Sequence, residues 1–461
     1  MMLSKRTDRD TSKDAALTPT YAARALNSRV PRNELPEGEM APDIAYNLIH
    51  DELMLDGNSR LNLATFVTTW MEPQARLLMA ETFDKNMIDK DEYPQTAEIE
   101  HRCVNIIARM WNASQEAIGT STLGSSEAAM LCGMALKRRW RERMKAQGKP
   151  TDKPNLVMGI NVQVCWEKFA RYWDVEPRLI PVEPNRYHLS AEEAIKACDE
   201  NTIGVVAILG STFDGSYEPI KEISDALDRL QSEQGLDIPI HVDAASGGFV
   251  APFLQPHLEW DFRVPRVVSI NTSGHKYGLV YPGIGWAIWR DQSVLPEDLI
   301  FSVNYLGGQM PTFTLNFSRP GNQVIAQYYN FLRLGREGYT RIQHSCQQTA
   351  LYLAERIAKM GPFELISDGS DIPVFAWKLK TETNFTLFEL SDHLRYHGWQ
   401  VPAYTMPKNC EDLIVQRIVV KEGFSRDMAD LLLANMHEAL HFFASQPGHV
   451  PRRTESRFAH L

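Results

Sequence analysis

Short apolar runs rich in Val and Ile alternate with amphipathic stretches between about residues 60 and 345, and this alternation restricts the possible folds more than any other feature. Several runs are continuously apolar, which is typical of strands buried on both faces of a mainly parallel sheet. Helical patterns separate the runs, so the sequence predicts an α/β fold. The expected strands are Asn155–Gly159, Ile203–Gly210, Ile238–Ala245, Val267–Thr272 and Ile284–Trp289, and the clearest expected helices are Ser126–Ala146 and Ile220–Gln234.

The pattern changes after residue 345, where strands become fewer and helices longer. It predicts a large α/β domain at residues 60–345 and a smaller α+β domain at residues 346–461, with a helix from Asn322 to Lys359 between the two parts. Residues 1–59 are polar and interrupted by proline, so we expect an N-terminal arm with one helix, Pro42–Leu55. The small domain is expected to contain the strands Ile372–Leu379 and Leu413–Val420 and the helices Leu387–Tyr396 and Ser425–Ser445.

Charge and cysteine content limit the partners and the location. The formal net charge of −10 argues against nucleic acid, whose phosphates attract a basic surface. No apolar run approaches the roughly 20 residues that span a bilayer, so no stable membrane association is expected. The six cysteines are widely spaced without a CxxC pair, and no signal-peptide pattern opens the chain. These features favour a cytoplasmic protein with reduced thiols.

A Gly- and Ser-containing turn, Gly119–Ala129, leads directly into one of the expected helices. The amino end of a helix offers free N–H groups and the positive end of the helix dipole. Ser125 and Ser126 add hydroxyl donors, so this segment suits a phosphate group. The alternative is that one of these serines only caps the helix.

Two further segments each place a reactive side chain at the end of an expected strand. In Ile238–Gly248, Asp243 is followed by small residues, which suits an acid that keeps a pyridine nitrogen protonated beside a flat ring. In Ser269–Gly278, Lys276 follows Ser-Gly-His and suits an amine that bonds an aldehyde. The alternatives are an Asp that caps a turn and a solvated surface lysine.

The order of these three segments favours one cofactor. Ligands of α/β sheets bind beyond the carboxyl ends of the strands, where the three segments would converge. Pyridoxal 5′-phosphate (PLP) requires an anion cradle, an acid at its ring nitrogen and an amine for its aldehyde. The sequence therefore predicts a PLP site.

Longer stretches resemble the group II PLP-dependent decarboxylases of fold type I (the aspartate aminotransferase-like fold), and among them the glutamate decarboxylases of bacteria and plants. The similarity extends over nearly the whole chain from about residue 40, and it rests on Asn62–Pro73, Asn86–Pro94, Ser269–Lys276, Tyr305–Gln309 and Phe313–Pro320. The resemblance implies PLP as cofactor and L-glutamate as substrate. It also implies that the products are 4-aminobutyrate (GABA) and CO₂, with one proton consumed.

The resemblance also implies roles around the cofactor. Lys276 is expected to bond its aldehyde, and Asp243 is expected to pair with its ring nitrogen. Gln163 is expected to stack on the ring, where many related decarboxylases have a His. The remaining expected contacts are Ala245 under the ring, Thr212 near the 3-hydroxyl, Ser125, Ser126 and His275 at the phosphate, and Ser318 reaching the phosphate from a neighbouring subunit.

On the substrate side, the resemblance assigns the α-carboxylate to Arg417. The distal carboxylate is assigned to a pocket contributed across a dimer and formed by Thr65, Phe66, Asn86 and Asp89. Asp89 would face a substrate carboxylate, and two like charges at hydrogen-bond distance cannot both stay ionised. We therefore expect activity to favour acidic pH. His460 near the C-terminus is a candidate pH latch, with a frayed terminus as the alternative.

Other interpretations have weaker support. His437 and His441 fit the H-E-x-x-H zinc motif, but they flank an apolar helix face, and few residues remain for a third ligand. No metal site is expected, and a zinc hydrolase is a remote alternative. The nearer alternative is a PLP-dependent decarboxylase of another amino acid, and an inactive PLP-fold scaffold is a further one. The cross-subunit pocket predicts at least a homodimer, with a homohexamer left open. No calmodulin-binding extension is expected, because no Trp follows Trp399.

Overall fold

The computed structural model describes residues 33–305, 309–446 and 448–451. Among these residues, those up to Asn62 belong to one compact unit and those from Leu63 onward to another, and each is described by itself. The first unit contains helix α1 (Pro42–Leu53) and a 3₁₀ turn (Ser59–Leu61). Pro42 begins α1, where a missing N–H is tolerated, and Asp43 lies near the positive end of the helix dipole. None of the residues of α1 is buried.

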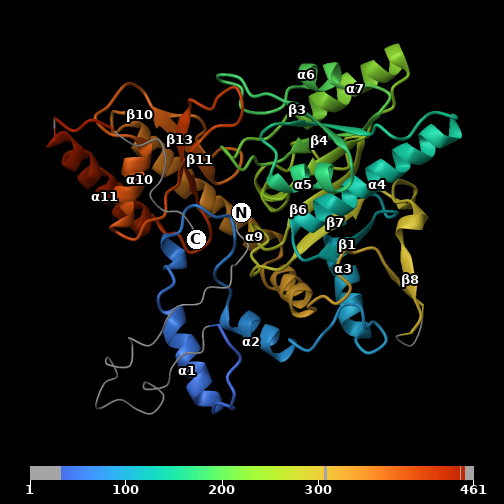
Figure 1. Ribbon diagram of the computed structural model, residues 1–461, viewed down its shortest axis with the longest axis horizontal. Helices are drawn as coiled ribbons and strands as arrows, with labels where there is room; N and C mark the ends of the chain where they lie inside the picture. Colours follow the sequence, from blue (N-terminus) through green and yellow to red (C-terminus); the bar gives the residue numbers. More distant parts are fainter. Residues whose placement is uncertain (1–32, 306–308, 447, 452–461) are drawn as a thin grey trace. The chain divides into compact units, whose positions relative to one another are not determined.

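A seven-stranded sheet forms the centre of the second unit (Figure 1). Its strands are β1 (Ile118–Thr122), β2 (Asn155–Gly159), β3 (Glu176–Ile180), β4 (Thr202–Ile208), β5 (Ile240–Asp243), β6 (Val267–Ser273) and β7 (Gly285–Trp289). They lie in the order β1-β7-β6-β5-β4-β2-β3. The run from β3 to β6 is parallel, and β7 is antiparallel to both β6 and β1. The predicted α/β class with a mainly parallel sheet is confirmed.

Helices cover both faces of this sheet, which explains its continuously apolar strands. Val205 and Ala207 of β4 belong to one core with α3 (Pro94–Met110) and α7 (Ile220–Gln234). Val206 and Ile208 of the same strand belong to a second core with α4 (Ser125–Ala146) and α5 (Val164–Tyr172). Side chains alternate between the faces of a strand, so each face receives its own apolar set. Burying each Val or Ile contributes about 1.5–3 kcal/mol.

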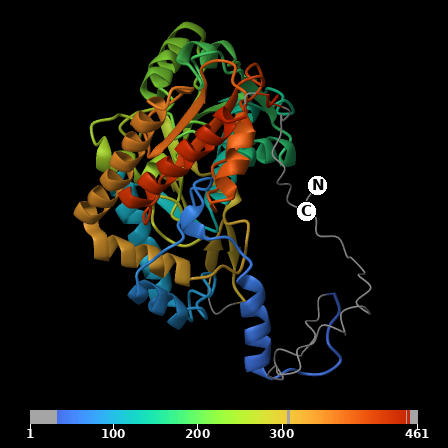
Figure 2. The ribbon, with the colours of Figure 1, turned by 90° about the vertical axis from the view of Figure 1, so that its left-hand side faces the viewer.

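A four-stranded antiparallel sheet forms nearer the C-terminus, in the order β10-β11-β13-β12. Its strands are β10 (Phe363–Leu365), β11 (Val374–Leu379), β12 (Ala403–Thr405) and β13 (Ile414–Val419), and its helices are α10 (Leu387–Arg395) and α11 (Arg426–Ala444). Thr386 and Glu389 form a capping box that begins α10. Helix α9 (Asn322–Ala358) bends at Gly335, whose φ of 56° is left-handed, and Figure 2 shows the bend.

The remaining described elements are short. They are α2 (Pro73–Glu81), α6 (Ala191–Lys196), α8 (Ala251–Leu254), the hairpin strands β8 (Phe301–Val303) and β9 (Met310–Thr312), and the 3₁₀ turns Gly247–Phe249, Gln292–Val294 and Glu297–Leu299. None of the described helices has the length and apolar character needed to cross a membrane.

Two strands of the large sheet were not expected from the sequence. The first part of the expected turn after Gly119 is strand β1, whose small residues lack an apolar pattern. Gly119 fits there because a Cβ would lie 2.5 Å from Ile288 Cδ1 on β7. The other strand, β3, lies at the edge of the sheet and is partly exposed, so its polar residues resemble a loop.

Candidate active site

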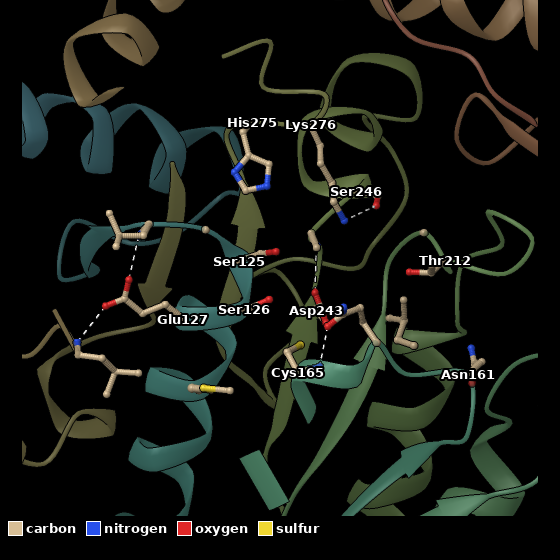
Figure 3. A pocket seen from close by; sticks show the side chains of 18 of the residues that line it. Ser125, Ser126, Glu127, Asn161, Cys165, Thr212, Asp243, Ser246, His275 and Lys276 are labelled. Atoms are coloured by element: carbon tan, nitrogen blue, oxygen red, sulfur yellow. Dashed lines mark hydrogen bonds between the residues drawn. The ribbon is translucent and has the colours of Figure 1, made fainter. Parts of the chain in front are cut away.

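A cavity of about 520 Å³ lies at the carboxyl edge of the parallel strands (Figure 3). The segments that follow β2, β4, β5 and β6 line it, together with the amino end of α4. The cavity therefore occupies the position at which parallel α/β sheets bind ligands. Its wall contains eight of the residues singled out in the sequence, namely Ser125, Ser126, Gln163, Thr212, Asp243, Ala245, His275 and Lys276.

Asp243 ends β5 and is only 5% exposed. Trp166 Nε1 donates a hydrogen bond to its Oδ2 at 2.8 Å. Asn271 Nδ2 and the backbone N–H of Ala245 donate to Oδ1 at 3.0 and 3.1 Å. The contact with Ala245 is the expected turn contact, but the other two donors come from distant parts of the chain. Together they hold the carboxylate in one orientation at the cavity wall.

Lys276 follows β6, and its side chain points toward Ser246 in the cavity rather than into solvent (Figure 3). Its Nζ donates to Ser246 Oγ at 3.3 Å and lies 5.0 Å from the centre of the Phe66 ring. Burial lowers the pKa of the Lys276 amine, and the charge of Asp243 opposes this shift. A lowered pKa increases the neutral fraction of the amine, which is the form that attacks a carbonyl group.

The cavity also has hydrogen-bond donors around the start of α4. Gly124 is the N-cap residue, so Ser125 and Ser126 occupy the first helical turn without capping the helix through their side chains. Ser273 Oγ donates to Ser125 Oγ at 2.7 Å. His275 Nδ1 is buried without a described hydrogen-bond partner, and a Cβ on Gly124 would lie 3.1 Å from His275 Cε1. Burial, assisted by the Lys276 charge, lowers the pKa of His275 to about 4, so its ring is neutral at pH 7.

Arg417 brings a positive charge from β13 to a position beside the Lys276 side of the cavity. It is 8% exposed, and its guanidinium lies 5.0 Å from the centre of the same Phe66 ring that faces Lys276. It donates to the backbone oxygens of Thr212 and Ala64, while its Nε is buried without a described partner. No carboxylate of the described residues forms an ion pair with it. A buried unpaired guanidinium has a high desolvation cost, which an anionic ligand would offset.

Phe66, which was assigned to a pocket contributed across a dimer, lies close to Lys276 and Arg417 of its own chain. The reason is local pairing. Leu63 N donates to Gln400 O at 3.0 Å, and Val419 N donates to Leu63 O at 2.9 Å, so this segment lies against the small sheet. Thr65, the next expected residue, is exposed.

Thr65, Phe66 and Arg417 are not among the residues that line this cavity, and neither are three other expected residues. Asn86 Nδ2 donates to Ser318 Oγ at 3.2 Å, and Asn86 Oδ1 accepts from the Arg319 N–H at 3.1 Å. Asp89 lies one turn further along, and its N–H donates to Asn86 O at 3.2 Å. Ser318 is exposed, and Asn86 and Asp89 are partly exposed. These residues form a separate cluster on this chain.

Gln163 lines the cavity and also begins α5. Its Oε1 accepts a hydrogen bond from Cys165 N at 2.6 Å, which is an N-cap contact. His437 and His441 are exposed on α11. Within the described part of the chain, no group of three or more His, Cys, Asp or Glu side chains could hold a metal ion. His460 lies outside the described residues.

Several residues at the site were not singled out in the sequence. Trp166, Asn271 and Ser246 contact Asp243 or Lys276, and Glu127 accepts from the N–H groups of Leu123 and Leu315 at 2.8 and 2.9 Å. Ser246 and Asn271 lie within the motifs around Asp243 and Lys276, so their proximity in sequence was a usable signal. No motif in the sequence pointed to Trp166, because its contact with Asp243 depends on how α5 packs on the sheet.

The residues present fit PLP. Lys276 supplies an amine of lowered pKa, and Asp243 supplies a buried carboxylate. Hydrogen-bond donors surround Gly124, where a Cβ would crowd the His275 ring. Comparison with known sequences agrees, because the pyridoxal-dependent decarboxylase conserved domain matches residues 36–380.

The chain belongs to the pyridoxal-dependent decarboxylase family. It is 60% identical over 440 residues to the glutamate decarboxylase of Aliivibrio fischeri, covering 94% of this chain and 95% of that protein. It is 51% identical over 454 residues to the glutamate decarboxylase of Petunia hybrida, covering 98% and 90% of the two chains. The structure of the glutamate decarboxylase of Lactobacillus brevis CGMCC 1306 superposes with a TM-score of 0.89 at 47% identity, covering 93% of this chain and 98% of that one. The resemblance, the fold type and the PLP cofactor expected for this decarboxylase are confirmed.

Two buried acids of this decarboxylase make its stability depend on pH. Glu218 accepts hydrogen bonds from Leu189 N, Ile208 N and Asn161 Nδ2, and burial raises its pKa from an ordinary value near 4.5 to about 7. Burial raises the pKa of Glu422 to about 7 as well. The folded protein then retains protons that the unfolded chain has released, so stability falls as pH rises from about 4.5 to about 7. Each shift corresponds to a loss on the order of 3 kcal/mol.

Replacing Glu422 with glutamine removes one of these two losses. We therefore expect the unfolding temperature to fall less between about pH 5 and about pH 7.5 in Glu422→Gln than in the unmodified protein. Thermal unfolding followed by circular dichroism at both pH values measures the difference. Glu116→Gln is the matched control, because Glu116 is exposed and should keep the full dependence. Equal falls in the unfolding temperature of all three proteins would contradict the raised pKa of Glu422.

Proposed function

We propose that this protein decarboxylates L-glutamate to 4-aminobutyrate and CO₂, with one proton consumed in each turnover. The observation that carries the proposal is the near full-length similarity to glutamate decarboxylases, at 60% identity to a bacterial one and 51% to a plant one. The geometry supports it, because groups that suit PLP line the cavity, and the buried Arg417, which suits a carboxylate, faces the same Phe66 ring as Lys276.

In this proposal, Lys276 holds the cofactor through its amine, and Asp243 keeps the ring nitrogen protonated. Bound PLP supplies an electron sink for the pair released when the bond between Cα and the carboxylate breaks. The hydroxyls of Ser125 and Ser126, the His275 ring and the amino end of α4 hold the phosphate. Gln163, Ala245 and Thr212 line the same cavity, where they would contact the two faces of the ring and its 3-hydroxyl side.

Arg417 binds and orients the α-carboxylate that leaves. Its guanidinium is fixed by Phe66, Tyr404 and two backbone oxygens before substrate arrives, so little side-chain entropy is lost on binding. Its buried charge offsets that of the carboxylate until the carbon–carbon bond breaks. Phe66 faces both Arg417 and Lys276 and excludes water from the space between them.

The cluster formed by Asn86, Asp89 and Ser318 supports at least a homodimer. These residues do not line the cavity of their own chain, which suits residues that serve the site of a neighbouring subunit. In this arrangement Asn86 and Asp89, with Thr65, bind the distal carboxylate, and Ser318 reaches the phosphate. We also propose a cytoplasmic location, which suits six free cysteines.

We expect activity to be higher in acid than at neutral pH, because Asp89 and the distal carboxylate must share a proton. The test adds L-glutamate to the purified, PLP-loaded protein at about pH 4.5 and about pH 7 and measures 4-aminobutyrate, together with the CO₂ that any decarboxylated substrate releases. L-Aspartate, an aromatic amino acid and a sulfinic amino acid serve as comparison substrates. Product from glutamate alone, mainly at the lower pH, supports the proposal. Product from another substrate, with none from glutamate, would overturn the substrate assignment, and an optimum above neutrality would overturn the role of Asp89.

A further inference from the structure

A row of buried polar side chains extends from Asp243 into the sheet, away from the cavity. Asn271 Nδ2 donates to Asp243 Oδ1 at 3.0 Å. Asn271 Oδ1 lies 2.7 Å from His241 Nε2, and His241 Nδ1 lies 2.8 Å from Ser269 Oγ. Asn271, His241 and Ser269 are 0% exposed. His241 and Asp243 lie on β5, and the other two lie on β6, so the parallel pairing of the strands sets the row.

The chemistry of the groups fixes the direction of each hydrogen bond. A carboxylate only accepts, so Asn271 must present its NH₂ group to Asp243. Its amide oxygen then faces His241 and can only accept, so the proton of the neutral ring is on Nε2. Nδ1 is left as an acceptor for the Ser269 hydroxyl. The opposite orientation of the amide would place Asn271 Oδ1 against the carboxylate of Asp243, which is repulsive.

The surroundings of His241 keep the ring neutral. Burial lowers the pKa of His241 to about 4, against the opposing effect of Asp243. The Trp166 ring, whose Nε1 binds the other oxygen of Asp243, lies 5.1 Å from the His241 ring centre to centre. Each donor in the row therefore points toward Asp243, and hydrogen bonds aligned in this way strengthen one another.

We infer that His241 is a positioning residue for the cofactor: its Nε2–H fixes the amide of Asn271 so that Asn271 donates to Asp243 and holds this carboxylate against the cofactor's ring nitrogen. The inference rests on the proposed role of Asp243 toward PLP. It does not depend on the identity of the substrate. Without the Nε2–H donor, the amide oxygen of Asn271 is buried without a hydrogen-bond partner. No hydrogen bond from His241 then holds the amide in the orientation that directs its NH₂ group at Asp243.

The test compares His241→Gln with His241→Met. The two side chains have similar shape and length, but only glutamine can place an N–H donor near the position of Nε2. The readout is the dissociation constant of PLP, measured by fluorescence quenching as PLP is added to the apoprotein in the absence of substrate. We expect His241→Met to bind PLP about tenfold more weakly, equivalent to about 1.4 kcal/mol, and His241→Gln to recover most of that loss. The visible absorbance of the PLP-loaded variants should change in the same order.

A double-mutant cycle with Asn271→Ala separates positioning from packing. If His241 acts through Asn271, His241→Met weakens PLP binding much less in the Asn271→Ala background than in the unmodified protein. Equal weakening in both backgrounds, or equal weakening by Gln and Met with a matching fall in unfolding temperature, would overturn the inference. Unchanged PLP binding in His241→Met would overturn it too. These outcomes are distinct from failure of the proposed function, which would appear as normal PLP binding without 4-aminobutyrate from glutamate.

Discussion

Replacing Lys276 with alanine is expected to abolish decarboxylation, with a loss in kcat on the order of a thousandfold or more. The Lys276 amine contacts Ser246 and the Phe66 ring at the cavity. The described lining of the cavity contains no other lysine. The measurement is 4-aminobutyrate production, together with the visible absorbance of the purified protein after PLP is added. The absorbance due to covalently held PLP should be lost even though the phosphate-binding groups remain.

The control for this prediction is Lys168→Ala, which removes a lysine from an exposed position on α5. It should retain both activity and absorbance. Treatment with borohydride followed by mass analysis of peptides tests the same point directly, because reduction fixes the cofactor to its lysine. A labelled peptide that contains a lysine other than Lys276 would disprove the assignment.

Replacing Arg417 with methionine is expected to lower kcat/KM for L-glutamate by about a hundredfold or more, because a substrate carboxylate at this position would lose a buried, charged partner. Arg417→Lys should lie in between, since lysine keeps the charge but not the planar set of donors. Steady-state kinetics of both variants measure the effect. PLP binding should change little, because Arg417 is not among the residues around the expected phosphate position.

Stability measurements separate this role from a structural one. Arg417 has no carboxylate partner among the described residues, so its removal breaks no ion pair. The methionine variant loses the hydrogen bonds to Thr212 O and Ala64 O, but it also avoids the desolvation cost of a buried charge, which offsets that loss. We therefore expect the unfolding temperature of the substrate-free protein to change little. Arg171→Met, at an exposed position on α5, is the matched control for kinetics and stability. A large fall in unfolding temperature with an unchanged KM would instead show that Arg417 supports the fold.

The sequence by itself determined the fold class and the central chemistry. The largely apolar runs at β2, β4, β5 and β6 predicted a parallel sheet, because strands buried on both faces lack the regular alternation of apolar and polar residues. Asp243 and Lys276 could be singled out because each lies within a short motif at the end of such a run, and both line the cavity. The polar strands β1 and β3 were not predicted. Strand β1 depends on the packing of Gly119 against a neighbouring strand, and β3 lies at the edge of the sheet.

Only the tertiary structure decided which side chains meet at the cavity and beside it. Phe66, Lys276 and Arg417 are far apart in the chain, and their contact depends on pairing between the segment after Asn62 and the small sheet. The same is true of Trp166 and Asn271, which reach Asp243 through helix packing and strand register. Periodicity and motifs report local preferences along the chain. Contacts between distant segments depend on how whole elements pack, and no single stretch of sequence contains that information.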